Sequence, residues 1–221
     1  MGKLIVFEGI DGSGKSTQFQ RICARFECER RDFIRVAFPQ YDEPSSALIR
    51  MYLGGEFGDD PDSVNAYAAS SFFAVDRFAS FKKLWQRYYE RGGVILTDRY
   101  TTSNAIHQGA KLTPESREEF FRWLYEYEFR LMGLPKPDMV LYMDIEAKEA
   151  ETRLLRRQSE TSTVGDIHEK AEFLEKSANC AEHAARYYDW RKISCFSGGR
   201  ERTEDEIEQE IYEILTGLWG E

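Results

Sequence analysis

The sequence predicts an α/β fold: a doubly wound, five-stranded parallel sheet with helices on both faces. The first observation is a set of five short apolar runs rich in β-branched residues, which is typical of strands buried on both sides. The second is that longer segments with helical periodicity separate these runs, as the crossovers between parallel strands require. The expected strands are residues 4–7, 34–38, 94–97, 139–143 and 193–196.

Six helices are expected between and after these strands. Gly-Gly pairs at residues 54–55, 92–93 and 198–199 mark helix ends or turns. The polar stretch 158–165 separates two charged helices and is expected to be a mobile loop. The expected helices are residues 16–31, 61–91, 114–132, 147–158, 167–191 and 204–219.

The composition predicts one soluble domain with a substantial core. Of the 221 residues, 42% are hydrophobic, and no stretch resembles a linker, so we expect a single domain over residues 1–221. The formal charge of -9 argues against binding to nucleic acid polymers or anionic membranes, and the apolar amino-terminal run is too short for a signal peptide or a membrane span. Four cysteines without CxxC spacing favour a cytoplasmic protein with reduced thiols over a zinc site or a disulfide framework.

A glycine-rich segment lies between the first expected strand and the first expected helix. It matches the pattern Gly-x-x-x-x-Gly-Lys-Ser/Thr, in which backbone amides and a helix amino terminus surround the phosphates of a nucleotide. Lys15 adds a positive charge near the β- and γ-phosphates, and the Ser16 hydroxyl suits Mg²⁺. The segment predicts a P-loop NTPase fold that binds a nucleoside triphosphate, with an ordinary glycine-rich turn as the alternative. Its residues are Gly9, Ile10, Asp11, Gly12, Ser13, Gly14, Lys15, Ser16 and Thr17.

Asp98 and Arg99 follow the third expected strand, at the edge where open α/β sheets bind ligands. An isolated Asp-Arg pair is more often a structural salt bridge. The strand that ends in Asp98 has the form of a Walker B element, however, which favours a role with Mg²⁺ and phosphate. We therefore expect Ser16 and Asp98 to lie near a metal ion.

Five separated motifs of the chain share one pattern. They are residues 7–17, Phe38-Pro39, 73–77, 98–104 and 137–144. Together they resemble the thymidylate kinases, a family of P-loop nucleoside monophosphate kinases, over nearly the whole chain. The resemblance implies transfer of the γ-phosphate of ATP to thymidylate (dTMP), with Mg²⁺ as cofactor. It also implies a homodimer, for which the aromatic helix 64–89 is the candidate interface.

The same resemblance assigns a group of residues to the dTMP acceptor. Phe73 would stack on the thymine ring, with a core aromatic as its alternative, and Arg77 would bond a base carbonyl, with a surface charge as its alternative. Arg99 would hold the acceptor phosphate through two donors, and Asp11 would face the acceptor sugar and the metal. The other implied dTMP-binding residues are Phe38, Pro39, Tyr41, Ser103, Asn104, His107 and Asp166.

A lid over residues 153–168 is also implied. Family members place an additional catalytic arginine either in the P-loop or in the lid, and this P-loop has none. The lid helix carries three arginines, for which a solvated basic face is the alternative. Asp166, which the resemblance places at the acceptor site, would serve equally well as a helix cap. The implied catalytic residues are Asp11, Lys15, Arg99, Arg153, Arg156 and Arg157.

His107 stands where relatives commonly have a tyrosine beneath the deoxyribose. Histidine is smaller and forms hydrogen bonds, so the preference for deoxyribose over ribose stays open. A kinase for another pyrimidine monophosphate, such as dUMP or UMP, is therefore the first alternative. A GTP-dependent switch is the second, although the chain has no Asn-Lys-x-Asp sequence for guanine recognition.

Overall fold

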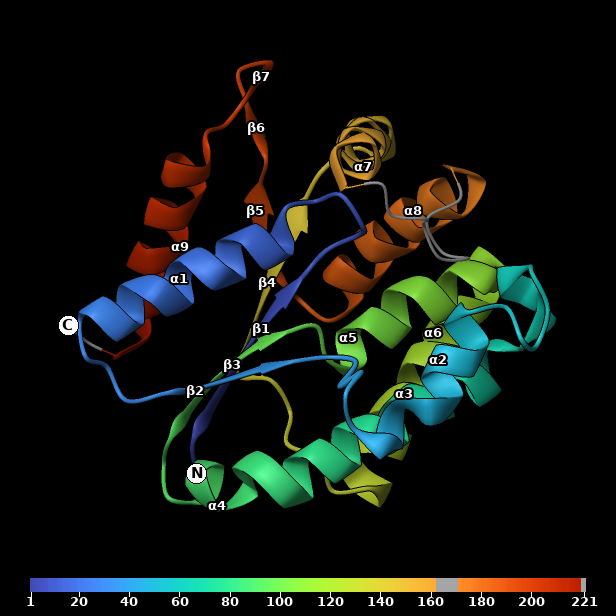
Figure 1. The fold of residues 1–221 in the computed structure, drawn as a ribbon, viewed down its shortest axis with the longest axis horizontal. Helices are drawn as coiled ribbons and strands as arrows, with labels where there is room; N and C mark the ends of the chain where they lie inside the picture. Colours follow the sequence, from blue (N-terminus) through green and yellow to red (C-terminus); the bar gives the residue numbers. More distant parts are fainter. Residues whose placement is uncertain (162–170, 220–221) are drawn as a thin grey trace.

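The computed structural model describes residues 1–161 and 171–219. Five strands form one parallel sheet in the order β2-β3-β1-β4-β5, which confirms the predicted doubly wound fold (Figure 1). A separate antiparallel pair, β6 and β7, projects beyond the end of β5 (Figure 1). The strands are β1 (Lys3–Glu8), β2 (Ile34–Ala37), β3 (Val94–Asp98), β4 (Met139–Asp144), β5 (Arg191–Ser194), β6 (Phe196–Ser197) and β7 (Arg200–Glu201).

The central strand β1 is buried on both faces, as its unbroken apolar run predicts. Residues 4–7 have no exposed surface. Phe7 pairs in register with Asp98 of β3 and with Leu141 of β4, so the carboxyl ends of these strands meet at one edge. The Arg99 amide then donates a hydrogen bond to the Phe7 carbonyl at 3.0 Å, which brings the segment after β3 beside the segment after β1.

Helices cover both faces of the sheet (Figure 1). α1 and α9 pack against each other on one face, and the helices between β2 and β5 cover the other. The chain crosses the sheet in one direction before β2 and in the opposite direction afterwards, and right-handed crossovers then place the helices on opposite faces. No helix of the described residues is long and apolar enough to cross a membrane. The α-helices are α1 (Lys15–Cys28), α2 (Ala47–Leu53), α3 (Ala66–Ser80), α4 (Gln86–Glu90), α5 (Thr101–Ser103), α6 (Pro114–Leu124), α7 (Ala147–Thr161), α8 (Ala171–Tyr187) and α9 (Glu204–Trp219).

The prediction of one helix over residues 61–91 is wrong. Pro61–Ser63 forms a separate 3-10 turn, η2, and α3 begins only after Asn65, whose side chain accepts a hydrogen bond from the Ala68 amide at 2.9 Å. After α3 the chain widens into a π-helix, η3 (Phe81–Trp85), before α4. Asn65 was a usable signal for the helix start, because asparagine is a preferred amino-terminal cap.

The boundaries near the expected lid also differ from the prediction. α7 continues to Thr161, so residues 158–161 are helical instead of forming the start of a loop. The rest of the expected loop, through residue 165, lies outside the described residues. Within the described part, α8 begins at Ala171 and ends at Tyr187.

The chain after α8 forms β5 and a short hairpin. Arg191, which was expected at the end of a helix, begins β5, and this strand ends at Ser194, before the predicted residue 196. Phe196 belongs instead to the β6–β7 hairpin. Gly198 and Gly199 form its turn with φ values of 58° and 78°, as a two-residue turn with left-handed central residues requires.

Two further π-helices are η4 (Asn104–Gln108) and η6 (Tyr125–Leu131). η6 continues α6, so the expected helix 114–132 is helical as far as residue 131 but changes its hydrogen-bond pattern midway. π-helices are rare and frequently occur at functional sites. The remaining 3-10 turns are η1 (Pro44–Ser46) and η5 (Gly109–Lys111).

Candidate active site

Two cavities adjoin at the carboxyl edge of the sheet, and Asp11 lines both. The larger, of about 350 Å³, lies over the segment between β1 and α1, and we call it the P-loop pocket. The smaller, of about 130 Å³, is bounded by the segment after β2, by α3 and by η4, and we call it the side pocket. Asp11 therefore marks the point where ligands in the two pockets would meet.

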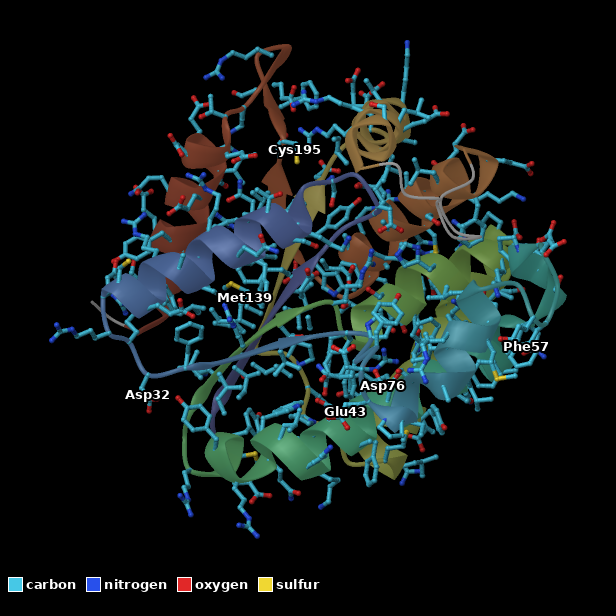
Figure 2. The ribbon with its side chains drawn as sticks, in the orientation of Figure 1. Asp32, Glu43, Phe57, Asp76, Met139 and Cys195 are labelled. Carbon is cyan, nitrogen blue, oxygen red and sulfur yellow. The ribbon has the colours of Figure 1, made fainter. Side chains whose placement is uncertain are left out.

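The P-loop pocket contains seven of the nine predicted P-loop residues, Asp11 to Thr17. Gly9 and Ile10 do not line it. Ile10 is fully buried, and its carbonyl accepts a hydrogen bond from the Ser13 amide at 3.1 Å, so it supports the loop from below. Arg153 and Arg156, two of the arginines expected from the lid, also line it. The unpredicted lining residues are Gln18, which directly follows the P-loop, and Met143, Leu154, Cys195, Glu201, Arg202, Glu204 and Ile207, which come from distant parts of the chain. Figure 2 shows Cys195 between α7 and the end of β5, at this pocket.

Gly12 is required where α7 passes over the loop. Its φ of 82° lies in the left-handed region, and a Cβ at this position would lie only 2.3 Å from the Ala150 carbonyl oxygen. The loop and the lid helix can approach this closely only with glycine here.

Lys15 is almost completely buried at the start of α1, and its Nζ lies 3.5 Å from Asp11 Oδ1. Burial lowers the pKa of Lys15, the neighbouring charge of Arg99 lowers it further, and Asp11 acts in the opposite direction. An anionic ligand beside Lys15 would favour its charged form. The site is thus prepared for phosphate oxygens.

Arg99 lies between the two pockets in a backbone conformation that non-glycine residues rarely adopt, with φ of 67°. Its guanidinium donates to Asp11 Oδ1, to Ser103 Oγ at 3.2 Å and to His107 Nε2 at 3.0 Å. Burial opposes the charged form of Arg99, but Asp11, Glu8 and Asp98 together raise its pKa above the ordinary value. Arg99 therefore stays cationic and is held in place from several sides.

Glu8 is a buried carboxylate that the sequence analysis missed. It has no exposed surface and accepts hydrogen bonds from Thr102 Oγ1 at 2.6 Å, from Ser103 Oγ at 2.8 Å and from the Gly9 amide at 2.9 Å. Burial raises the pKa of Glu8, and the charge of Arg99, 3.8 Å away, lowers it. An acidic residue at the end of a buried strand was the available signal, because such a charge needs partners.

The side pocket brings together all the predicted acceptor residues that the structure describes. They converge from the segment after β2, from α3, from the segment after β3 and from η4. Asp166 lies outside the described residues. The predicted lining residues are Asp11, Phe38, Pro39, Tyr41, Phe73, Arg77, Arg99, Ser103, Asn104 and His107; the unpredicted ones are Leu53, Tyr100 and Gln108.

Phe73 and Arg77 lie one turn apart on α3, and both face the side pocket. Phe73 is partly buried: its ring packs edge-on against Tyr52 of a small buried cluster, at 6.3 Å between centroids, and it also lines the pocket. Arg77 is 1% exposed, which excludes the surface-charge alternative. Its Nε and Nη2 donate to the two carboxylate oxygens of Glu128 at 2.7 and 2.6 Å.

The segment after β2 is fixed to α3 by Asp76, which the sequence analysis did not single out. Asp76 is buried and accepts from the Gln40 amide at 2.8 Å and from Ser45 Oγ at 2.5 Å. Figure 2 shows Asp76 on the side of α3 toward this segment. The contact holds the residues on either side of Gln40, Pro39 and Tyr41, which wall the side pocket.

Arg153 of α7 lies against the P-loop. Its Nη1 donates to the Ser13 carbonyl at 3.1 Å and to the Gly12 carbonyl at 3.4 Å, and its Nη2 pairs with Glu201 of β7 at 2.5 Å. Arg156 lines the same pocket, so neither residue belongs only to a solvated face. Arg157 follows on the same helix.

Asp98 fits a role beside a cation. Its Oδ1 atom is buried, and no donor among the described residues forms a hydrogen bond with it. Ser16 lines the P-loop pocket, and the described residues contain no cluster of three acidic, histidine or cysteine side chains that would hold a metal alone. Asp98 lines neither pocket, although its charge acts on Lys15 and on Arg99. Mg²⁺ is commonly bound by one or two carboxylates together with substrate phosphates.

Comparison with known proteins agrees with this geometry. The thymidylate kinase family, described by the family model "Thymidylate kinase", matches residues 7–211. A thymidylate kinase of Mycobacterium tuberculosis is 32% identical over 192 residues, 85% of this chain and 88% of the relative, and that of Dictyostelium discoideum is 27% identical over 97% of this chain and 85% of the relative. The solved structure of thymidylate kinase from Candida albicans has the same fold, with a TM-score of 0.71 and 23% identity over 98% of this chain and 92% of that one. The chain therefore belongs to the thymidylate kinase family.

Proposed function

We propose that this ATP-dependent dTMP kinase binds ATP in the P-loop pocket and dTMP in the side pocket. The observation that carries the assignment is that the two cavities meet at Asp11, with Lys15 on one side and Arg99 on the other. A γ-phosphate held by the P-loop and an acceptor phosphate held by Arg99 would approach each other at this junction. Transfer then depends on positioning and on neutralising the charge of the two phosphates.

Each charged group at the junction has a role that follows from its surroundings. Lys15 neutralises the transferred group, and Arg99 binds the acceptor phosphate through its two-pronged guanidinium. Asp11, in contact with both cations, offsets their mutual repulsion before the substrates bind and faces the acceptor sugar afterwards. Glu8 fixes the positions of Arg99, through an ion pair, and of Ser103, through a hydrogen bond.

Base and sugar recognition belong to the walls of the side pocket. Phe73 offers a flat apolar face for stacking on thymine, and Arg77 and Asn104 offer polar atoms to the edge of the base. The segment with Phe38, Pro39 and Tyr41 closes the phosphate end of the pocket. His107 supports Arg99 and lies where the sugar would be placed.

Mg²⁺ is the cofactor that the donor set fits. Ser16 would supply a hydroxyl oxygen, and Asp98 would supply the carboxylate oxygen that lacks a donor. When bound, the ion neutralises charge on the β- and γ-phosphates.

We further propose a single domain with a lid over residues 153–168. Arg153 and Arg156 face the P-loop pocket, and Arg157 and Asp166 are the remaining lid candidates. Arginines on a closing lid would add positive charge at the transferred phosphate and exclude water. The pairing of Arg153 with Glu201 gives this lid a resting contact on the β6–β7 hairpin.

A homodimer in the cytoplasm completes the proposal. Val75 and Phe78 on α3 and Leu84 on η3 are 50%, 37% and 49% exposed, and together with Tyr67 they form an apolar face on the predicted interface helix. All four cysteines are free, which suits a reducing compartment. Sedimentation of the purified chain tests the dimer: a monomer at micromolar concentration would refute it.

A coupled assay of ADP production tests the substrate assignment. The acceptors are dTMP, dUMP, UMP and dCMP at one ATP concentration, with Mg²⁺ and with a chelator as control. We expect dTMP to give the highest kcat/KM. Equal values for dTMP and UMP would overturn the assignment, and ATP hydrolysis independent of any acceptor would favour a nucleotide-dependent switch.

A further inference from the structure

Both predicted base-reading residues, Arg77 and Asn104, are bonded to one buried carboxylate, Glu128. Glu128 has no exposed surface and lies on the π-helix η6. We propose that Glu128 is a positioning residue that sets the base selectivity of the side pocket. The inference rests on the proposed assignment of this pocket to the nucleotide acceptor.

Glu128 determines which Arg77 donors remain for a ligand. It accepts one hydrogen bond from Nε and one from Nη2, while Nη1 donates to the Tyr100 carbonyl at 3.3 Å. Thr101 Oγ1 donates to the same carboxylate at 2.7 Å and fixes its plane. Of the five N–H groups of the guanidinium, three are used within the protein, and the remaining ones on Nη1 and Nη2 are available to the pocket.

Glu128 also determines the orientation of the Asn104 amide. Nδ2 of Asn104 donates to Glu128 Oε1 at 3.3 Å and to the Ser70 carbonyl at 3.2 Å. Both partners are acceptors, so the nitrogen must lie on this side, and a flipped amide would place two oxygens against each other. Asn104 therefore presents its oxygen, an acceptor, to the pocket.

A donor from Arg77 beside an acceptor from Asn104 has a defined complement. Thymine and uracil carry a carbonyl oxygen at position 4 and an N–H at position 3, which match this pair. Cytosine carries an amino group at position 4 and an unprotonated nitrogen at position 3, so it meets a donor with a donor and an acceptor with an acceptor. Buried polar groups left unpaired make such a mismatch costly.

The ionised form of Glu128 is what enforces this pattern. A carboxylate only accepts hydrogen bonds, whereas a glutamine at the same place could turn its amino group toward Asn104 and allow that amide to flip. A buried ion pair is weak grounds for stability, but it is a known means of fixing one arrangement of side chains. The location of Glu128 on a π-helix agrees with such a role.

The test compares kcat/KM for dUMP and dCMP, because these acceptors differ only at the edge of the base that the pair would read. We expect Glu128→Gln to reduce the dUMP/dCMP ratio roughly tenfold or more, while KM for ATP stays unchanged. Glu126→Gln is the matched control: Glu126 is on the same π-helix, but 44% of its side chain is exposed, and its carboxylate pairs with Arg130 of the same helix. It should retain the wild-type ratio.

Thr101→Val keeps the test decisive if Glu128→Gln does not fold. This substitution keeps the charge pair and the side-chain shape but removes the hydrogen bond to Glu128 Oε2, so the ratio should fall by a smaller factor, about threefold. If folded Glu128→Gln keeps the wild-type dUMP/dCMP ratio, the inference about Glu128 is wrong, while the acceptor assignment still stands. If Glu128→Gln is unfolded, a wild-type ratio in Thr101→Val has the same meaning. If the wild-type enzyme itself prefers dCMP or shows no preference, the acceptor assignment fails, and the inference fails with it.

Discussion

The two pockets are built in different ways. The core of the P-loop pocket comes from one continuous segment, residues 11–17, whose glycines and backbone amides form the proposed phosphate site. The side pocket is lined from five separate parts of the chain, and several of its side chains are hydrogen-bonded within the protein before any ligand binds. A phosphate site of backbone atoms tolerates little change in local sequence, whereas a pocket of interlocked side chains depends on the whole fold.

The two pockets also differ in how their charges are balanced. In the side pocket, each arginine is paired with a buried carboxylate: Arg77 with Glu128, and Arg99 with Glu8 in addition to Asp11. Lys15 on the P-loop side pairs with Asp11 at 3.5 Å, and this carboxylate is shared with Arg99. The proposed acceptor side therefore has more of its positive charge balanced in advance than the proposed donor side.

Removing Lys15 should give the largest effect and should affect the donor side alone. We expect Lys15→Met to lower kcat by about a thousandfold, because one positive charge on the transferred phosphate is lost, while dTMP affinity changes less than about threefold. Rapid-quench kinetics and calorimetric dTMP titration measure the two quantities. Lys3→Met, at the opposite end of β1, is the control. A comparable loss of dTMP affinity in Lys15→Met would contradict the division of the pockets.

Replacing Arg99 should produce the converse pattern. Arg99→Gln should reduce kcat/KM for dTMP about a hundredfold, because the two-pronged phosphate contact is lost, and ATP affinity should stay within about threefold of wild type. Steady-state kinetics and ATP titration check this, with the exposed Arg35→Gln as control. An equal loss of ATP affinity in Lys15→Met and Arg99→Gln would show that the assigned roles are wrong.

His107 tests whether the Arg99 guanidinium is held in place before the acceptor binds. His107→Phe retains an aromatic ring but removes the nitrogen that receives Arg99 Nη1 at 3.0 Å. We expect KM for dTMP to rise about fivefold with little change in kcat or in KM for ATP, because Arg99 loses one of its supports. His183→Phe, a substitution of the same chemistry far along the chain on α8, should leave all three parameters unchanged. An unaltered KM for dTMP would mean that His107 does not help to place Arg99.

The last prediction concerns Lys111, which contacts Tyr52 behind the side-pocket residue Phe73, and it appears in stability instead of kinetics. Lys111 donates to Tyr52 Oη at 2.8 Å and to the Val64 carbonyl at 2.7 Å, and burial lowers its pKa to about 8. Between pH 8 and the ordinary lysine pKa of about 10.4, the unfolded chain binds a proton at Lys111 that the folded chain does not. The free energy of unfolding should therefore rise with pH across this window. The expected rise is on the order of 1–2 kcal/mol, because Lys111 is partly exposed. Below pH 8 the folded chain bears the full cost of holding a charged Lys111.

Urea unfolding at pH 7.5 and 9.5 (roughly the two sides of the window) measures this contribution. Lys111→Met removes the titrating group. The free energy of unfolding of the wild type minus that of the variant should therefore increase with pH. Lys82→Met, on the exposed side of η3, controls for the loss of a lysine. Parallel pH profiles of wild type and Lys111→Met would contradict the prediction.

Prediction from sequence succeeded where signals are local. The five strands of a doubly wound parallel sheet and the P-loop fold follow from apolar runs and glycine spacing, and they are confirmed, whereas the order of the strands came from the structure. The helix break before α3 was missed although Asn65 marked it, and the changes to π-helix at η3, η4 and η6 leave no comparable signal. A π-helical segment depends on the residues that a helix packs against, and these residues come from distant parts of the chain.

The same distinction applies to the site. The sequence by itself determined that a glycine-rich loop of the P-loop type follows β1, because that feature depends on residue type and short spacing, and its motifs predicted the acceptor residues. Only the tertiary structure decided that Glu8 lies beneath Arg99, that Glu128 joins Arg77 to Asn104, and that Asp76 fixes the segment after β2. These carboxylates are far in sequence from most of the groups they hold, and a buried charge reveals its partner only when folding removes both from water.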